Sequence, residues 1–382
     1  MGGMERNAGP LTNSFLGKPP CDGGKPYVRE PRAFLASSRA CYPFILPPVN
    51  PALDTLLLAF GPEGLAVPER TLFLGAEPHP ALKDWPGVLG WQPFKPKAVA
   101  WDTAGFRRVD QPEGAFPCVL VLPGKSRDET LALFARAYDL LEPGGLLVAS
   151  MPNTAGAARF EKELAKAAGS IGSLQKHKCR AFHAVKNDGW NLALLAEWRS
   201  AGERKPVAGT EFIAEAGVFS PDHVDPASAL LAKHLPGDLR GKVADLGAGW
   251  GFLSQEIARR FPAVTRLDLF EADARALACA EHNLAAFPEV ARFHWHDVAA
   301  GLGEVGYDAV VTNPPFHSGQ KTDVGLGKAF IHAAAGALKR GGRLFLVANR
   351  QLPYEAELEA AGFSWRKPAE DSTFKLLFAT KR

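Results

Sequence analysis

Two stretches of the sequence that lie far apart in the chain carry the same pattern. Residues 140–153, "LLEPGGLLVASMPN", and residues 337–350, "ALKRGGRLFLVANR", both pass from an expected helix end through a Gly-Gly turn into an apolar run. Upstream, "TLFLGAEPHPAL" (71–82) takes the place that "VADLGAGWGFLS" (243–254) has in the second half. Self-similarity of this kind indicates that one whole domain has been duplicated within the chain.

The second copy alternates strand-like and helix-like segments. Apolar runs such as "KVADLG", "TRLDLF" and "RLFLVAN" predict buried strands, whereas "GFLSQEIARRF" and "AFIHAAAGALKRGG" predict helices, the latter ended by glycine. Such alternation predicts an α/β fold of the Rossmann type, with a parallel sheet covered by helices on both faces. The first copy has kept this pattern but has lost the glycine motif described below.

The domain organisation follows from these copies and from the segments between them. The Gly- and Pro-rich residues 1–50 predict an irregular extension. The polar stretch "SAGERKPVAG" (200–209) predicts a linker. We therefore expect a first domain over residues 51–200 and a second over residues 210–382.

Composition limits the classes of protein to consider. With 46% hydrophobic and 22% charged residues, the chain can bury two ordinary cores. The five cysteines form no CxxC pair, which predicts a reduced, cytoplasmic protein rather than a disulfide-bonded one. No apolar run approaches the ~18 residues that a membrane span needs, so we expect no membrane partner. A net charge of +3 decides nothing about a polyanion partner, and we expect a monomer.

A glycine-rich turn follows the first strand of the second copy. The strand reaches Asp245 and then runs into Gly247, Gly249 and Gly251 before a helix begins. Glycines at such a turn allow positive φ and let a ligand approach the backbone closely. The spacing is GxGxG rather than the GxGxxG of dinucleotide sites, so a nicotinamide-dependent oxidoreductase is a weaker alternative.

Two further carboxylates follow the next strands. Glu271 ends "TRLDLFEAD", and Asp297 ends "FHWHDV". At these positions one acid can accept hydrogen bonds from ribose hydroxyls and the other from an adenine amino group. Acids at strand ends can also simply cap the following helices. Because the carboxyl ends of parallel strands meet at one edge, Asp245, Glu271 and Asp297 together predict a nucleoside-cofactor site.

The segment "VVTNPPFHSG" (310–319) raises a separate question. After a buried run it presents Asn313, then Pro314 and Pro315, and then Phe316. The two prolines have no N–H group and hold φ near −65°, so the turn is stiff. A stiff turn that presents an amide and an aromatic ring is suited to holding a planar polar group. A purely structural turn is the alternative.

A metal site is a weaker interpretation of another cluster. Cys279, His282, His294 and His296 could be drawn as a zinc set. The first two should lie on a helix and the last two on a strand, where packing and surface polarity explain them. We therefore predict no metal.

The order of "DLGAGWG", "FEAD", "HD" and "NPPFH" resembles that of class I S-adenosylmethionine-dependent methyltransferases. In that class the Asn-Pro-Pro-Phe signature implies methylation of a planar amino or amide nitrogen. More narrowly, "GVFS", "VDPASALL", "TNPPFHSG" and "VANRQLPY" resemble the RsmC family of bacterial ribosomal RNA guanine-N2 methyltransferases and its large-subunit relatives. Those enzymes also carry two tandem methyltransferase-like domains, the first degenerate and the second catalytic.

The resemblance implies a role for each motif residue. Asp245, Gly247 and Gly249 would hold the methionine part of S-adenosylmethionine, Glu271 the ribose and Asp297 the adenine. Residues 217–220 would close over the cofactor. The catalytic residues would be Asn313 and Pro314, whose oxygens would accept hydrogen bonds from the guanine amino group, and Phe316, which would stack on the base; Pro315 would stiffen this substrate-binding turn.

The partner implied is ribosomal RNA or the small ribosomal subunit. Reaching a base amino group requires an unpaired or flipped nucleotide. Basic residues of the first domain are candidates for holding the RNA backbone and should contribute affinity and salt dependence rather than rate. These candidates are Lys125, Arg127, Lys176, Lys178 and Arg180.

Several alternatives remain open from the sequence. The substrate could be large-subunit ribosomal RNA, an adenine in DNA or a glutamine side chain of a release factor, although Tyr usually replaces Phe316 in the latter two families. A protein without catalysis, such as an RNA-binding ribosome-assembly factor, is the alternative from a different class.

Overall fold

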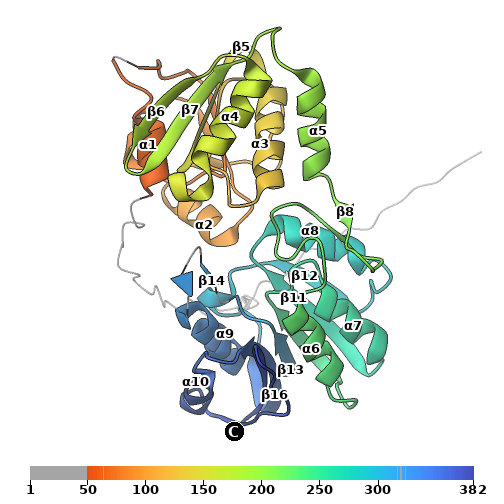
Figure 1. Ribbon diagram of the computed structural model, residues 1–382. Coiled ribbons are helices and arrows are strands. Elements are labelled where there is room, and N and C mark those ends of the chain that lie inside the picture. Colours follow the sequence, from red (N-terminus) through yellow and green to blue (C-terminus); the bar gives the residue numbers. More distant parts are fainter. Residues whose placement is uncertain (1–49, 63, 316, 319–320, 323) are drawn as a thin grey trace, which may run out of the picture. The chain divides into compact units, whose positions relative to one another are not determined.

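The computed structural model describes residues 50–382 except positions 63, 316, 319, 320 and 323, and between 316 and 323 it describes backbone only. Of the predicted extension (1–50), all but Asn50 lies outside the described residues, and so does Phe316. Figure 1 shows two α/β domains that follow one another along the chain.

The first domain is built on a seven-stranded sheet. The strand order is β3-β2-β1-β4-β5-β7-β6, and β7 and β6 at one edge are antiparallel to their neighbours. Its strands are β1 (Thr71–Leu74), β2 (Val88–Trp91), β3 (Arg107–Arg108), β4 (Phe116–Val121), β5 (Leu141–Pro152), β6 (Gly172–Lys176) and β7 (Cys179–Val185). Its helices are α1 (Pro51–Leu57), α2 (Lys95–Thr103), α3 (Arg127–Asp139), α4 (Ala157–Ala168) and α5 (Leu192–Gly202).

The second domain repeats this sheet strand for strand. The order is β12-β11-β10-β13-β16-β18-β17, again with the last two strands antiparallel. Its strands are β10 (Gly241–Leu246), β11 (Val264–Glu271), β12 (Ala291–Trp295), β13 (Tyr307–Thr312), β16 (Leu338–Asn349), β17 (Phe363–Arg366) and β18 (Phe374–Lys381). Its helices are α6 (Pro226–His234), α7 (Phe252–Arg260), α8 (Ala274–Asn283), α9 (Val324–Ala337) and α10 (Tyr354–Ala360). The fold class predicted from the sequence, two tandem Rossmann-like domains, is confirmed.

The Gly-Gly pairs do not end helices, contrary to the sequence prediction. Helix α9 ends at Ala337, and the glycines lie inside β5 and β16. A Cβ on Gly145 would lie 2.9 Å from the carbonyl oxygen of Glu142, and one on Gly342 would lie 2.8 Å from that of Lys339. Each of these two contacts joins residues three apart in the same strand, at the point where the register with the neighbouring strand shifts. The chain makes a tight turn there that only glycine fits. Both copies share this constraint, which supports their common origin.

Each face of the second sheet carries its own core. Successive β10 residues alternate between the two, since Val243 packs with α6, α7 and α8 and Ala244 packs with α9 and α10. Such alternation is the period-2 pattern of a strand buried on both sides. Because the helices cover the two faces of the sheet, its carboxyl edge remains uncovered, and the site described below lies there.

The segment predicted as a linker packs with the second domain. Helix α5 continues to Gly202, and β8 (Lys205–Pro206) then pairs with β9 (Ile213–Ala214). Val207 and Phe212 are buried in one cluster with Trp250. The short hairpin thus covers the indole of the glycine-rich turn.

The two α/β domains contact each other through backbone hydrogen bonds. The N–H of Lys95 donates to the carbonyl of Ala272 at 2.7 Å, and the N–H of Ala274 donates to that of Pro93 at 2.9 Å. The Trp295 indole also donates to Pro93 at 2.9 Å. The start of α2 therefore docks on the loop that follows β11. Across the part of the chain that is described, no helix has the length and apolar content to cross a membrane.

Candidate functional site

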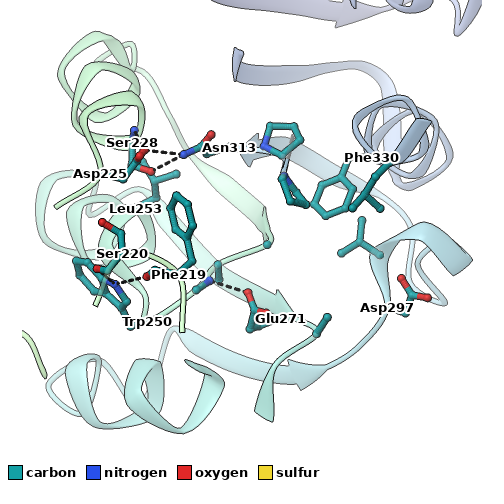
Figure 2. A pocket seen from close by; sticks show the side chains of 18 of the residues that line it. Phe219, Ser220, Asp225, Ser228, Trp250, Leu253, Glu271, Asp297, Asn313 and Phe330 are labelled. Atoms are coloured by element: carbon teal, nitrogen blue, oxygen red, sulfur yellow. Dashed lines mark hydrogen bonds between the residues drawn. The ribbon is translucent and has the colours of Figure 1, made fainter. Parts of the chain in front are cut away.

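A cavity of about 590 Å³ opens at the carboxyl edge of the second sheet (Figure 2). This volume is in the range that holds a small organic ligand. Of the residues predicted for the site from the sequence, those that line the cavity are Gly247, Gly249, Glu271, Asp297, Asn313, Pro314 and Pro315. The structure thus brings together residues that follow four different strands.

The glycine turn between β10 and α7 needs glycine at each position. Gly247, Gly249 and Gly251 have φ values of 73°, 56° and 91°. A Cβ on Gly251 would lie 2.7 Å from Leu284, whereas one on Gly249 would meet nothing within 4 Å. Gly251 therefore serves packing against α8, and Gly249 leaves open space beside the backbone for a ligand.

Asp245 lies behind this turn and does not line the cavity. Its side chain is fully buried, and its Oδ2 accepts a hydrogen bond of 2.7 Å from Ser254 Oγ. No described side chain or backbone group donates to its Oδ1. The pKa of Asp245 is raised to about 7: burial is the largest cause, the hydrogen bond from Ser254 opposes the rise, and the charge of Glu271 adds to it. The Oδ1 of Asp245 can therefore accept a further hydrogen bond.

Glu271 joins two loops at the cavity wall. Its Oε2 accepts the backbone N–H of Gly249 and its Oε1 that of Asp273, both at 2.8 Å. Burial raises its pKa, and these backbone donors oppose the rise. Each oxygen retains a lone pair, so the carboxylate can accept further hydrogen bonds from a pair of hydroxyls.

Asp297 caps a short helix and also lines the cavity. Its Oδ1 accepts the backbone N–H of Ala299 at 2.9 Å and so caps the short 3-10 helix Val298–Ala300. The residue also lines the cavity, next to Val298. Capping does not prevent it from contacting a ligand.

Asn313 follows β13, and two neighbours hold its amide. Its Nδ2 donates to Asp225 Oδ2 at 2.8 Å and to Ser228 Oγ at 2.9 Å, as the dashed lines of Figure 2 show. Both partners line the same cavity. They come from "VDPASALL", but neither was assigned a role from the sequence, because the contact spans 88 positions in the chain.

The segment 217–220 borders the cavity through two residues. Phe219, whose side chain is 58% exposed, and Ser220 are lining residues. The Trp250 indole donates to the carbonyl oxygens of both, each at 3.1 Å. Trp250 was not singled out from the sequence; it ties this segment to the glycine turn.

The first domain also contributes to the cavity wall. Phe94, Pro96 and Lys97 are lining residues, and Phe94 remains 40% exposed. The Lys97 ammonium lies 2.6 Å from Glu77 Oε1. No sequence signal pointed to these residues, since a single aromatic residue before a helix is a common feature.

The basic residues predicted to bind RNA have different surroundings. Lys125 precedes α3, and Arg127, at its start, pairs with Asp128 at 2.8 Å. Lys178 lies in the turn between β6 and β7 at a φ of 59°, directly after Lys176 and His177. Arg180 pairs with Glu161, and both side chains are largely buried. Register places the turn and the end of β4 at the carboxyl edge of the first sheet.

The residues considered as a metal set are held in other ways. His294 lies 2.7 Å from Asp268, His296 lies 2.7 Å from the carbonyl of Gly301, and Cys279 is buried in α8. In the described ranges no three His, Cys, Asp or Glu residues are grouped so that they could hold a metal ion.

Three comparisons place the chain among known proteins. Residues 209–378 match the family described as "Methyltransferase small domain". The "Ribosomal RNA small subunit methyltransferase C" of Psychromonas ingrahamii is 30% identical over 270 residues, which cover 70% of this chain and 76% of that protein. That of Pseudomonas paraeruginosa is 32% identical over 321 residues, covering 81% and 94%.

One solved structure resembles the whole described architecture. It is the T. thermophilus 16S rRNA N2 G1207 methyltransferase (RsmC) in complex with AdoMet and guanosine. The TM-score is 0.73 at 26% identity, and the match covers 87% of this chain and 92% of that one. The likeness therefore extends over both domains.

Proposed function

Since the chain belongs to the family of ribosomal RNA small subunit methyltransferase C, we propose that it methylates the exocyclic N2 amino group of a guanine in 16S ribosomal RNA. The methyl donor is S-adenosylmethionine. The observation that carries this proposal is the Asn313 amide at the cavity wall, held beside Pro314 and facing the same space as Glu271 and Asp297.

The cavity offers a complementary group for each part of the cofactor. Glu271 and Asp297 both line the cavity, and we propose that Glu271 accepts the ribose hydroxyls and Asp297 the adenine amino group. We propose that the methionine part lies in the open space beside Gly249, and that the Oδ1 of Asp245 acts on it through a bridging group. Bound in this way, S-adenosylmethionine supplies an electrophilic methyl group on a positively charged sulfur.

The residues after β13 prepare the nucleophile. A guanine amino group is weakly nucleophilic because its lone pair is delocalised into the ring. If its two N–H groups donate to Asn313 Oδ1 and to the Pro314 carbonyl, the nitrogen moves towards tetrahedral geometry and its lone pair turns to the methyl group. Orientation of this kind can supply much of the rate acceleration.

The reaction requires no strong base. A nitrogen–carbon bond forms as the carbon–sulfur bond breaks, and the nitrogen then loses a proton to water. The two prolines fix the direction of the carbonyl, so little ordering remains to be done on binding. Phe316 is proposed to stack on the base, a contact worth about 1–3 kcal/mol.

The first domain is proposed to bind RNA. Lys125, Arg127 and Lys178 lie at the carboxyl edge of its sheet and can reach phosphates. Arg180 is less available because Glu161 already pairs with it. We place the enzyme in the cytoplasm, where bacterial ribosomal RNA is made and assembled.

Labelling and digestion of ribosomal RNA test the proposal. The protein is incubated with tritiated S-adenosylmethionine and total ribosomal RNA or 30S particles that lack the modification, and the labelled nucleoside is identified after digestion. We expect N2-methylguanosine from 16S RNA. Label in 23S RNA, in another nucleoside or in no RNA at all would contradict the proposal.

A further inference from the structure

Asp225 Oδ2 receives two hydrogen bonds that connect a helix to the catalytic turn. The backbone N–H of Ser228 donates to it at 2.8 Å, which makes Asp225 the N-cap of α6. The amide nitrogen of Asn313 donates to the same oxygen at 2.8 Å. Capping explains the first bond and would be satisfied by Asn, Ser or Thr as well. It does not explain the second.

The chemistry of a carboxylate decides how the Asn313 amide is turned. An amide carries an acceptor oxygen on one branch and a donor nitrogen on the other, and the two have nearly the same shape. A carboxylate accepts hydrogen bonds and cannot donate one. Facing Asp225, the amide must therefore present its nitrogen, and its oxygen occupies the other branch. The described residues donate no hydrogen bond to that oxygen.

We propose that Asp225 is a positioning residue, which holds the Asn313 amide so that its oxygen, not its nitrogen, faces the guanine amino group. This inference rests on the proposed function. With the amide reversed, two donors would oppose each other, and the hydrogen bond that prepares the nucleophile could not form. Asp225 thereby sets the polarity of the base site without touching the base.

Ser228 supports the same orientation but cannot impose it. Its hydroxyl accepts from Asn313 Nδ2 at 2.9 Å, but a hydroxyl can equally donate, so it would tolerate either amide orientation. Both residues lie at the start of α6, beside Asn313 (Figure 2). The fixed end of a helix is thus used to orient a side chain on a sheet edge.

Asp225→Ser is the variant that tests this role. Serine also caps a helix, but while its oxygen accepts the Ser228 N–H, its hydroxyl can either donate to the Asn313 amide or accept from it. Asn313 can therefore adopt either orientation. We expect kcat for methylation of 16S RNA to fall about thirtyfold, with the KM values for S-adenosylmethionine and RNA changed less than about twofold. The midpoint of thermal unfolding should stay close to that of the wild type.

Asp371→Ser is the matched control. Asp371, like Asp225, accepts two hydrogen bonds on one oxygen, here both from backbone N–H groups, of Thr373 and Phe374 at 2.7 Å each, but it does not line the cavity. We expect this variant to retain wild-type kcat. An equal loss of kcat in both variants would show that a general effect of Asp→Ser is being measured and would overturn the inference.

Asp225→Asn provides a stricter test. If the asparagine turns its oxygen to the Ser228 N–H and so keeps the cap, the same oxygen again accepts from the Asn313 amide nitrogen. We expect Asp225→Asn to recover at least about fivefold in kcat over Asp225→Ser.

The outcomes separate the two proposals. If the wild-type protein labels no guanine in 16S RNA, the proposed function fails. If the wild type is active and Asp225→Ser matches its kcat, or if Asp225→Asn is no faster than Asp225→Ser, the positioning role of Asp225 is refuted while the proposed function stands.

Discussion

Arg275 Nη1 lies 2.5 Å from Glu129 Oε1, although the two residues are 146 positions apart and belong to different domains. Both side chains are largely buried, and Asp273 pairs with the same guanidinium at 2.7 Å. Burial by itself would lower the pKa of Arg275, but the two carboxylates raise it above its ordinary value. The Glu129 side chain also lies so close to Gly217 that a Cβ there would be 2.6 Å from its carboxyl carbon. One acid of the first domain thus contacts two segments that border the cavity.

Replacing Glu129 should lower the free energy of unfolding of the protein. In Glu129→Gln the charged hydrogen bond to Arg275 is removed while Asp273 remains, so we expect the free energy of unfolding to fall by about 2 kcal/mol. Urea unfolding followed by tryptophan fluorescence measures this. The control is Glu163→Gln, which removes an exposed pair with Lys166 and should cost less than about 0.5 kcal/mol. Equal losses would mean that the interdomain pair has no special weight.

Asn313→Ala should abolish most of the catalysis while leaving cofactor binding intact. The variant removes the oxygen that orients the amino group, and losses of this type are about a hundredfold or more in kcat. Initial rates with tritiated S-adenosylmethionine and 30S particles measure kcat, and calorimetry measures the cofactor Kd. A variant that methylates at the wild-type rate would remove the basis of the proposed mechanism.

The stability of the cofactor-free enzyme should depend on pH through Asp245. Burial raises the pKa of its folded form to about 7, from an ordinary value of 3.8. The folded state therefore holds this proton more tightly than the unfolded state, and the stability that the proton provides is lost as the pH rises. Relative to Asp245→Asn, we expect the wild type to lose about 1.4 kcal/mol per unit between about pH 5 and 6.5. Parallel profiles of unfolding free energy for the two proteins would show that Asp245 does not titrate in this range.

Phe94→Ala should weaken cofactor binding from the other domain. The exposed ring lines the cavity, while the backbone beside it hydrogen-bonds to Ala272, the neighbour of Glu271. Loss of this apolar wall should raise the Kd for S-adenosylmethionine about tenfold, as measured by calorimetry. Leu192→Ala, which truncates an exposed side chain on α5, is the control and should leave the Kd unchanged. If Phe94→Ala binds as the wild type does, the Phe94 ring contributes no binding energy to the cofactor.

The basic residues of the first domain should affect RNA affinity and not rate. For Lys125→Ala and Lys178→Ala we expect a higher KM for RNA and an unchanged kcat. The dependence of log Kd on log salt concentration should become shallower by about one for each phosphate that a variant no longer neutralises. Filter binding at several salt concentrations measures the slope. Arg259→Ala, an exposed substitution near the end of α7, should leave it unchanged. Wild-type slopes in both lysine variants would exclude these residues from RNA binding.

The sequence was most informative where local pattern and chemistry coincide. The duplication, the α/β class and the family follow from strand periodicity and short motifs, and the repeated strand order and the relatives confirm them. The roles given to individual site residues stay predictions. The prediction that glycine ends helix α9 was wrong, because glycine can end a helix or allow a tight turn at the start of a strand, and only tertiary packing distinguishes these uses.

Other features depend on contacts that no local pattern contains. The hydrogen bond from Asn313 to Asp225 joins residues from separate elements, and a capping aspartate has the same sequence pattern with or without it. Phe94 reaches the cavity because α2 of one domain docks on the other. Neither relationship has a fixed spacing in the chain, so a single sequence could not reveal it.

The backbone contact between Pro93–Lys95 and Ala272–Ala274 limits how this protein can change over generations. Its first copy no longer carries the glycine turn, yet it lends a wall to the cavity of the second. A shorter protein that lacked the first domain would expose the Trp295 indole, and the cavity of the second domain would open to water. The second domain therefore depends on the first, and a return to a single-domain protein would remove part of the wall of its ligand site.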